Sequence, residues 1–412
     1  GESALDASVS GGNNTAIGGS ALTDLTSGTS NVAVGQEALK VNTTGASNTA
    51  VGRRALDANT TASNNTAVGN AALGANTTGP HNIAVGRNSL LLNTTGGYNV
   101  AVGGGALDSN VSGSNNVAVG FEALQENTSG NNTAIGYKAL EENTSGTDNV
   151  AVGYEALDAN TTANNNTAIG DIALTENTTG ADNTSVGASS LAANTTGASN
   201  VAVGANALDA NTTASNNTGI GFAALGANTT GTKNVAVGAN ALDANTTGDA
   251  NIAIGRDALG ANTTADNNTA VGADTLLSNT TGTQNVAVGA YALDANTTAN
   301  SAVAIGYQAL SANTTGAENI AIGAFCLDAN TTGGSNTAIG VSALGKNTTA
   351  NNNVAVGYDA LKENTTGEKN TAVGVEAFQN NTTASNNTGF GRRAGKANTT
   401  GTLLVAIGQG AL

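Results

Sequence analysis

One motif recurs along this chain so regularly that it constrains the fold more than any other feature. Asn-Thr-Ala-Ile-Gly at 14–18 returns as Asn-Val-Ala-Val-Gly at 31–35, and further copies follow up to Gly408. The step between copies is seventeen residues, except for one step of sixteen between Asn116 and Asn132, and twenty-four copies result. The unit reads Asn-[Thr/Val/Ile]-Ala-[Val/Ile]-Gly-x-x-Ala-Leu-x-x-Asn-Thr-Thr-Gly-x-x. A fixed short period of this kind is typical of a repeat architecture rather than of a globular domain.

A unit of seventeen residues is too short for a helix pair and suits one coil of a parallel β-solenoid. In such a fold each coil bonds to the next at a spacing of about 4.8 Å. We therefore predict an all-β parallel solenoid of about two dozen coils, as a single repeat array over residues 1–412. The sixteen-residue coil is expected to lose a turn residue near Asn131, because a deletion within a strand would turn its side chains to the wrong face.

The strand of each coil has two kinds of side chain in alternation. Its first and third residues are β-branched, apart from Phe390, and this pattern predicts that they point into the core with the later Leu (Leu22, Leu39) on the opposite side. The middle residue, which is usually Ala, would then point outward. A stripe of small apolar residues along the surface favours packing against another copy, although Ala also tolerates a crowded, partly exposed site. The candidate packing residues include Ala33, Ala50, Ala67, Ala84, Ala101 and Ala118.

Composition excludes several classes of function. The formal net charge of −16 argues against nucleic acid, which demands a basic surface. The longest apolar run is far shorter than a membrane span, so no membrane insertion is expected. One His and one Cys with scattered carboxylates offer no catalytic or metal-binding set, so we predict neither an enzyme nor a cofactor or metal. Cys326 is expected to be a small buried side chain, and His81 to face solvent in a turn.

The two residues after the strand Gly vary freely and carry most of the aromatic side chains. We expect them to form exposed edges, where aromatic residues would contact a ligand if the chain binds one; the simpler interpretation is that they are only solvated. The candidate contact residues are Phe121, Tyr137, Tyr154, Tyr307 and Tyr358.

The Asn-Thr-Thr segments allow several interpretations. Stacked Asn side chains bond one another from coil to coil, whereas each Asn-Thr-Thr is also formally a glycosylation acceptor. The ladder is favoured, because acceptors about 4.8 Å apart could not all carry glycans. The Thr pairs at 43–44, 60–61 and 77–78 offer an alternative function, ordering water as an ice-binding surface. Calcium binding is less favoured, because the Asp residues recur irregularly.

With the repeat laid out, the strand motif resembles the head repeats of YadA-like trimeric autotransporter adhesins. It is also similar to the repeat arrays of bacteriophage tail fibres, in which Asn-Thr-Ala-Val-Gly, Ala-Leu and Asn-Thr-Thr-Gly recur together. The resemblance covers essentially the whole chain, but adhesin heads have shorter coils and lack the regular Asn-Thr-Thr segment. It implies a left-handed roll, three chains side by side, and attachment to a host-surface or matrix ligand.

The expected function is therefore an extracellular structural or adhesive fibre segment, on a cell surface or virion. Its expected partner is itself, as a homotrimer or an end-to-end filament. The chain begins (residues 1–10) and ends (Leu412) within a repeat without a polar cap. Because solenoids normally protect their open ends, we expect the segment to continue into a longer chain or to stack on its own copies.

Overall fold

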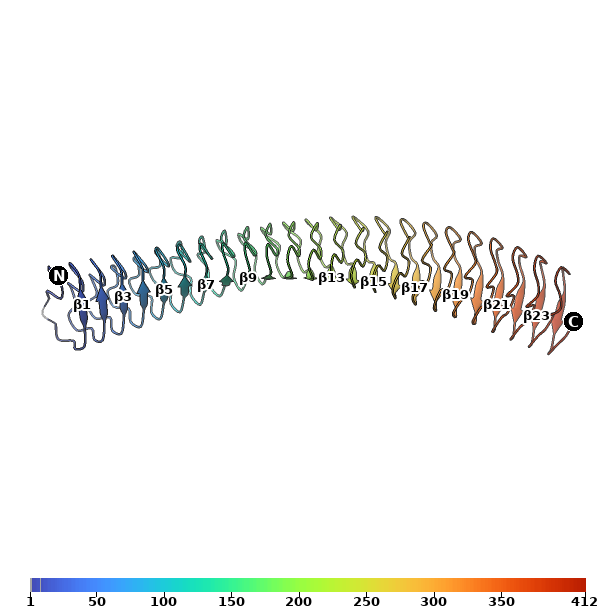
Figure 1. The fold of residues 1–412 in the computed structure, drawn as a ribbon, viewed down its shortest axis with the longest axis horizontal. Helices are drawn as coiled ribbons and strands as arrows, with labels where there is room; N and C mark the ends of the chain where they lie inside the picture. The colour runs from blue at the N-terminus through green and yellow to red at the C-terminus, as the bar shows by residue number, and fades with distance from the viewer. Residues whose placement is uncertain (1, 8) are drawn as a thin grey trace. The chain divides into compact units, whose positions relative to one another are not determined.

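The computed structural model describes residues 2–7 and 9–412, and all of the regular elements among them are three-residue β-strands. The chain divides into two compact units, Gly1–Ala205 and Asn206–Leu412. Within each unit every coil contributes one strand to a parallel sheet (Figure 1). The predicted all-β parallel solenoid with its seventeen-residue repeat is confirmed.

The strands follow one another at the repeat spacing in both units. Those of the first unit are β1 (Thr15–Ile17), β2 (Val32–Val34), β3 (Thr49–Val51), β4 (Thr66–Val68), β5 (Ile83–Val85), β6 (Val100–Val102), β7 (Val117–Val119), β8 (Thr133–Ile135), β9 (Val150–Val152), β10 (Thr167–Ile169), β11 (Thr184–Val186) and β12 (Val201–Val203). Those of the second unit are β13 (Thr218–Ile220), β14 (Val235–Val237), β15 (Ile252–Ile254), β16 (Thr269–Val271), β17 (Val286–Val288), β18 (Val303–Ile305), β19 (Ile320–Ile322), β20 (Thr337–Ile339), β21 (Val354–Val356), β22 (Thr371–Val373), β23 (Thr388–Phe390) and β24 (Val405–Ile407).

Neighbouring strands pair in register, so equivalent residues of successive coils lie side by side. In the first unit Ala33 of β2 lies opposite Ala50 of β3, and in the second unit Ala287 of β17 lies opposite Ala304 of β18. Each position of the repeat therefore forms a continuous rank of side chains within its unit, at the spacing of about 4.8 Å between bonded strands.

The glycine that closes each strand is required by the close approach of the next coil. Gly35 has φ +135°, and a Cβ on it would lie 2.5 Å from the carbonyl oxygen of Gly52. A side chain at this position would collide with backbone, and its φ lies in a region that residues with a Cβ rarely adopt. The same geometry recurs coil after coil, which explains why the glycine never varies.

A leucine in the left-handed region turns the chain after that glycine. Leu39 has φ 50° and Leu56 has φ 54°, a conformation that costs roughly 1–2 kcal/mol per residue. Both side chains are completely buried, and burial of a leucine contributes about 1.5–3 kcal/mol. The Leu39 N–H also donates to the Ala55 carbonyl at 3.0 Å. The predicted placement of these leucines in the core is confirmed, and their burial offsets the backbone strain.

The predicted orientation of the strand side chains is wrong. The middle alanines point into the core and are fully buried, whereas the β-branched residues on either side of each are partly or largely exposed. The interior of the coil is so narrow that a methyl group at this position already meets the leucine of the preceding coil: a Cβ built on Gly219 would lie 3.3 Å from Leu208 Cγ. Larger side chains must therefore point outward. The residues to which the correction applies are Ala33, Ala50, Ala67, Ala84, Ala101 and Ala118.

Departures from the core pattern occur together and compensate one another. Ser185 replaces the strand alanine, and its hydroxyl donates to the carbonyl of Ser190, which replaces the core alanine five residues later. Phe378 replaces the core leucine, and two glycines make room for it. A Cβ on Gly389 would lie 2.7 Å from Phe378 Cε2, and one on Gly395 would lie 2.3 Å from Phe378 Cε1.

The sixteen-residue coil keeps its strand in register, since Val117 of β7 still lies opposite Thr133 of β8. Asn127 donates to the carbonyl of Ser129 at 2.8 Å, whereas Asn110 in the previous coil donates to Gly113, three residues further on. The missing residue therefore belongs to the Thr-Thr part of the turn. The prediction of a deletion in the turn is confirmed, a few residues before the expected place.

Candidate functional site

Two ladders of asparagine run inside each unit. In the first, which starts each strand motif, the Asn48 N–H donates to Asn31 Oδ1 at 3.0 Å and Asn48 Nδ2 donates to the Ala62 carbonyl at 2.9 Å. In the second, the Asn of each Asn-Thr-Thr, Asn59 Nδ2 donates to Asn42 Oδ1 at 2.9 Å and to the same Ala62 carbonyl at 3.1 Å. All four asparagines are fully buried. The predicted ladder is confirmed, and it pairs polar groups that burial would otherwise penalise.

These bonds decide between the two interpretations of Asn-Thr-Thr. Asn59 Nδ2 has two hydrogens, and both are donated within the core. An acceptor nitrogen for a glycan must be reachable from solvent, whereas this one is buried. In the folded chain the asparagine of the Asn-Thr-Thr segment therefore has a structural role and is not a glycosylation site.

The two threonines of each pair lie differently. Thr43 Oγ1 donates to the Thr60 carbonyl of the next coil at 3.0 Å, whereas Thr44 is exposed. The same arrangement recurs at Thr60, whose Oγ1 donates to Thr77 at 3.3 Å. In the threonine ranks considered for ice binding, the second threonine of each pair therefore faces water. The hydroxyl hydrogen of the first threonine is donated to a carbonyl of the next coil.

The outer surface of each sheet is uncharged. We use the term strand face for the outward side chains at the first and third positions of every strand; in the described strands these are Thr, Val and Ile, with Phe390 as the exception. Val51 is 37% exposed, Ile135 41% and Ile254 39%. Single exposed apolar residues are ordinary, but a contiguous apolar surface marks an interaction site. The strand face is therefore the first candidate functional surface.

The second candidate surface is the turn edge, formed by the two residues after each strand glycine. Phe121, Tyr137, Tyr154, Tyr307 and Tyr358 are each about half exposed, which confirms the predicted exposure. In the first unit the rings of Phe121, Tyr137 and Tyr154 form a row, with centroids 5.8 and 5.3 Å apart and planes within 13° and 8° of parallel. In the second unit Tyr307 meets Phe325 edge-on at 5.5 Å.

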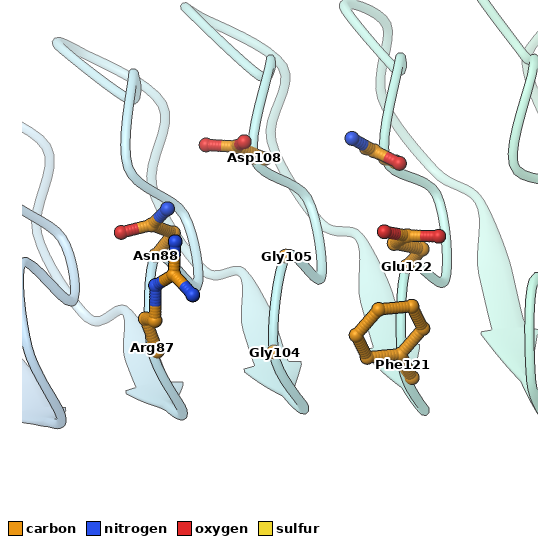
Figure 2. A pocket seen from close by; sticks show the side chains of 8 residues that line it. Arg87, Asn88, Gly104, Gly105, Asp108, Phe121 and Glu122 are labelled. Carbon is orange, nitrogen blue, oxygen red and sulfur yellow. The ribbon is translucent and has the colours of Figure 1, made fainter.

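A hollow of about 360 Å³ interrupts the turn edge at the Phe121 end of this row. Its floor is Gly104 and Gly105, and the side chains on either side come from the coils before and after (Figure 2). The remaining lining residues are Arg87, Asn88, Asp108, Phe121, Glu122 and Gln125. The sequence pattern predicts the exposure of Phe121 but does not by itself predict the hollow. Aligning the chain in register at the repeat spacing reveals it, because no other coil has glycine at both turn-edge positions.

Charged groups of both signs surround the hollow. Glu122 approaches Lys138 of the next coil at 3.7 Å, and Lys138 also pairs with Glu141 at 2.9 Å. The hydrogen bond that Lys138 donates to Glu141 raises the pKa of Lys138, so this lysine stays protonated. Among the described residues Arg87 has no carboxylate within ion-pair distance. Burial, with a contribution from the Glu126 charge, raises the pKa of Asp108.

The residues with the most reactive side chains do not form a site. Within residues 2–7 and 9–412 no group of three His, Cys, Asp or Glu side chains could hold a metal ion. Cys326 is buried, as predicted, and burial raises the pKa of its thiol to about 12. His81 is exposed, as predicted, and stacks on Tyr98 with centroids 4.9 Å apart.

Comparison with known proteins adds no family. No protein-family model matches the chain, and no curated protein matches it. Within the described residues no helix has the length and apolar character that a membrane crossing requires. The strand face and the turn edge are therefore the two candidate functional surfaces of the described residues.

Proposed function

We propose that the chain is an extracellular structural fibre segment whose copies associate side by side through the strand face and display the turn edge to a surface ligand. The observation that carries the proposal is the rank of uncharged, exposed β-branched side chains along each unit. The resemblance to trimeric adhesin heads and tail-fibre arrays supports a homotrimer and a place on a cell surface or virion.

The strand face has the properties that association requires. A chain with a net charge of −16 repels its copies, yet none of its charged side chains lies in the strand face. Burying this surface therefore removes apolar area from water without desolvating a charge.

The size of the strand face is also sufficient. Three residues of strand span about 10 Å, and twelve coils at about 4.8 Å give a surface of roughly 600 Å² in one unit. Three copies would then bury about 1,800 Å² per unit in total, so that each pair of chains buries about 1,200 Å² over the two units, which reaches the range of stable interfaces.

Particle mass tests the proposal directly. We expect light scattering on the purified chain to report three chains of 39.7 kDa each per particle. The variant Ile135→Lys/Ile169→Lys places two charges in the strand face and should yield monomers, because each charge would have to be buried unpaired in the interface. Its circular dichroism spectrum should be unchanged.

A matched control places the same charges outside the strand face. Tyr154→Lys/Ala188→Lys alters two turn-edge positions of the same unit and should leave the particle mass unchanged. A wild-type chain that is monomeric at micromolar concentration would refute the proposal, as would equal dissociation of both variants.

A further inference from the structure

The two glycines of the hollow are not required by the backbone. Gly105 has φ +69°, but Arg54 and Glu122 occupy the same position of their coils with φ 58° and 55°. A Cβ on Gly104 would lie 3.6 Å from Phe121 Cδ2, an ordinary contact. The fold therefore accepts a side chain at both positions. The effect of the two glycines is that this coil has no side chains at its turn-edge positions, between those of the neighbouring coils.

The space left by that missing side chain has the size of one six-membered ring. Gly104 lies between Arg87 and Phe121, which are two coils apart and therefore separated by about 9.6 Å of backbone. In Figure 2 the ring of Phe121 lies beside Gly104, with Arg87 on the far side. A ring in van der Waals contact with Phe121, at about 3.5–4 Å, would also reach Arg87.

Polar groups from three successive coils border this space. Asn88 and Gln125 provide amides, and Asp108 and Glu122 provide carboxylates. Amides, carboxylates and guanidinium groups present donors or acceptors in planar pairs. Asp108 Oδ1 is buried and has no hydrogen-bond partner.

The unpaired oxygen alone does not make a site, because Asp158 and Asp294, at the same position of other coils, also have one.

We propose that the hollow binds one pyranose unit of a glycan. The sugar ring packs against the side chain of Phe121, and its hydroxyl groups bond with Arg87 on one side and with Glu122 on the other. A purely aromatic ligand would pack on Phe121 equally well but would leave the surrounding polar groups unpaired. The site uses no residue of the strand face, so it does not depend on self-association.

Saturation-transfer NMR on the full chain provides the test, with the methyl glycosides of glucose, galactose and mannose as probes and phenol as the aromatic probe. We expect at least one glycoside to receive saturation and phenol to receive none. Phe121→Ala should weaken glycoside binding about tenfold, because it removes the apolar side chain against which the sugar packs.

Filling the hollow should abolish binding without disturbing the fold. Gly104→Tyr places a ring where Tyr137 and Tyr154 stand in their own coils, and should eliminate the glycoside signal. Ala188→Tyr introduces the same residue at the equivalent position of another coil and should preserve it. The proposal is overturned if no glycoside binds, if phenol alone binds, or if Gly104→Tyr binds as the wild type does. Measuring particle mass on the same samples separates this result from a failure of self-association.

Discussion

Ala302 occupies a place that asparagine holds in the neighbouring coils, so the first Asn ladder lacks one side chain there. The Ala302 N–H still donates to Asn285 Oδ1 at 2.9 Å. Alanine, however, offers no side-chain oxygen to the next N–H along the ladder, that of Asn319, whereas Asn268 Oδ1 accepts the N–H of Asn285 at 3.0 Å. A single residue thus marks a weak point in an otherwise regular network.

Restoring the ladder should stabilise the second unit. We expect Ala302→Asn to raise the free energy of unfolding by about 0.5–1.5 kcal/mol for each net hydrogen bond gained, measured by urea denaturation. The new side chain would accept from Asn319 and donate to Gly316, as Asn285 donates to Ala299 at 2.9 Å.

The opposite change provides the control. Asn268→Ala removes the acceptor of a buried N–H and should lower the free energy of unfolding by about 1–3 kcal/mol. If Ala302→Asn destabilised the chain, the side chain would not fit the space assigned to it, and the ladder would not be the stabilising feature of this region.

At the scale of a coil, the core is filled by sets of residues whose sizes match. Phe378 is fully buried although it is larger than the leucine of other coils. Gly389 in β23 and Gly395 leave the space that its ring occupies. Protein cores are close-packed, so changes in volume at such positions are strongly felt.

The three positions should therefore be energetically coupled. Gly389→Ala or Gly395→Leu alone should destabilise the chain by about 1–3 kcal/mol through overpacking. Phe378→Leu alone should also destabilise it, because it leaves a cavity. The triple variant restores the residues of the other coils and should recover most of the wild-type stability in urea denaturation. Additive losses would show that the three side chains do not share one space.

At the scale of the whole molecule, the aspartates that follow the core leucine give stability a common dependence on pH. Burial raises the pKa of each one, and for Asp158 it does so to about 7, with the charges of Glu141 and Glu155 adding to the effect. The others are Asp57, Asp108, Asp209, Asp243, Asp294 and Asp328. The folded chain therefore binds more protons than the unfolded chain above pH 3.8, the ordinary value of the aspartate pKa.

Stability should accordingly fall as the pH rises from about 4 to 8, because ionising these groups is harder in the folded state. We expect the thermal midpoint to be several degrees lower at pH 8 than at pH 5, since each kcal/mol lost lowers it by about 2–4 °C in a unit of this size. Calorimetry across this range measures the effect.

Asp158→Asn should raise the thermal midpoint at pH 8 and reduce the slope of the midpoint against pH up to about pH 7. The control Asp171→Asn, at an exposed turn-edge position, should change this slope little. Equal slopes in wild type and Asp158→Asn would contradict the prediction.

Glu376 acts in the opposite direction, because hydrogen bonds from Lys396 and Arg393 lower its pKa to about 2. Its contribution is lost only as the pH falls below about 4.5.

Much of this molecule could be predicted because each repeat position carries its own physical constraint. The spacing of the glycines predicted the coil, and the regular asparagines predicted the ladders. The aromatic residues of the turn edge named from the sequence were correctly expected to be exposed, whereas the charged residues Asp274 and Asp359 of the same edge are buried. The hollow was missed because Arg87, Gly104 and Phe121 are far apart in the chain and become neighbours only when the coils stack in register.

The sequence by itself determined the repeat, the parallel stacking of coils, the position of the leucines and the ladder of asparagines, because these follow from residue types at fixed spacing. Only the tertiary structure decided which side of the strand faces the core. An alternating pattern distinguishes two faces without assigning them, and here the narrow cross-section of the coil assigns them: the methyl groups of Ala33 and its equivalents fit inside, and the β-branched residues must lie outside.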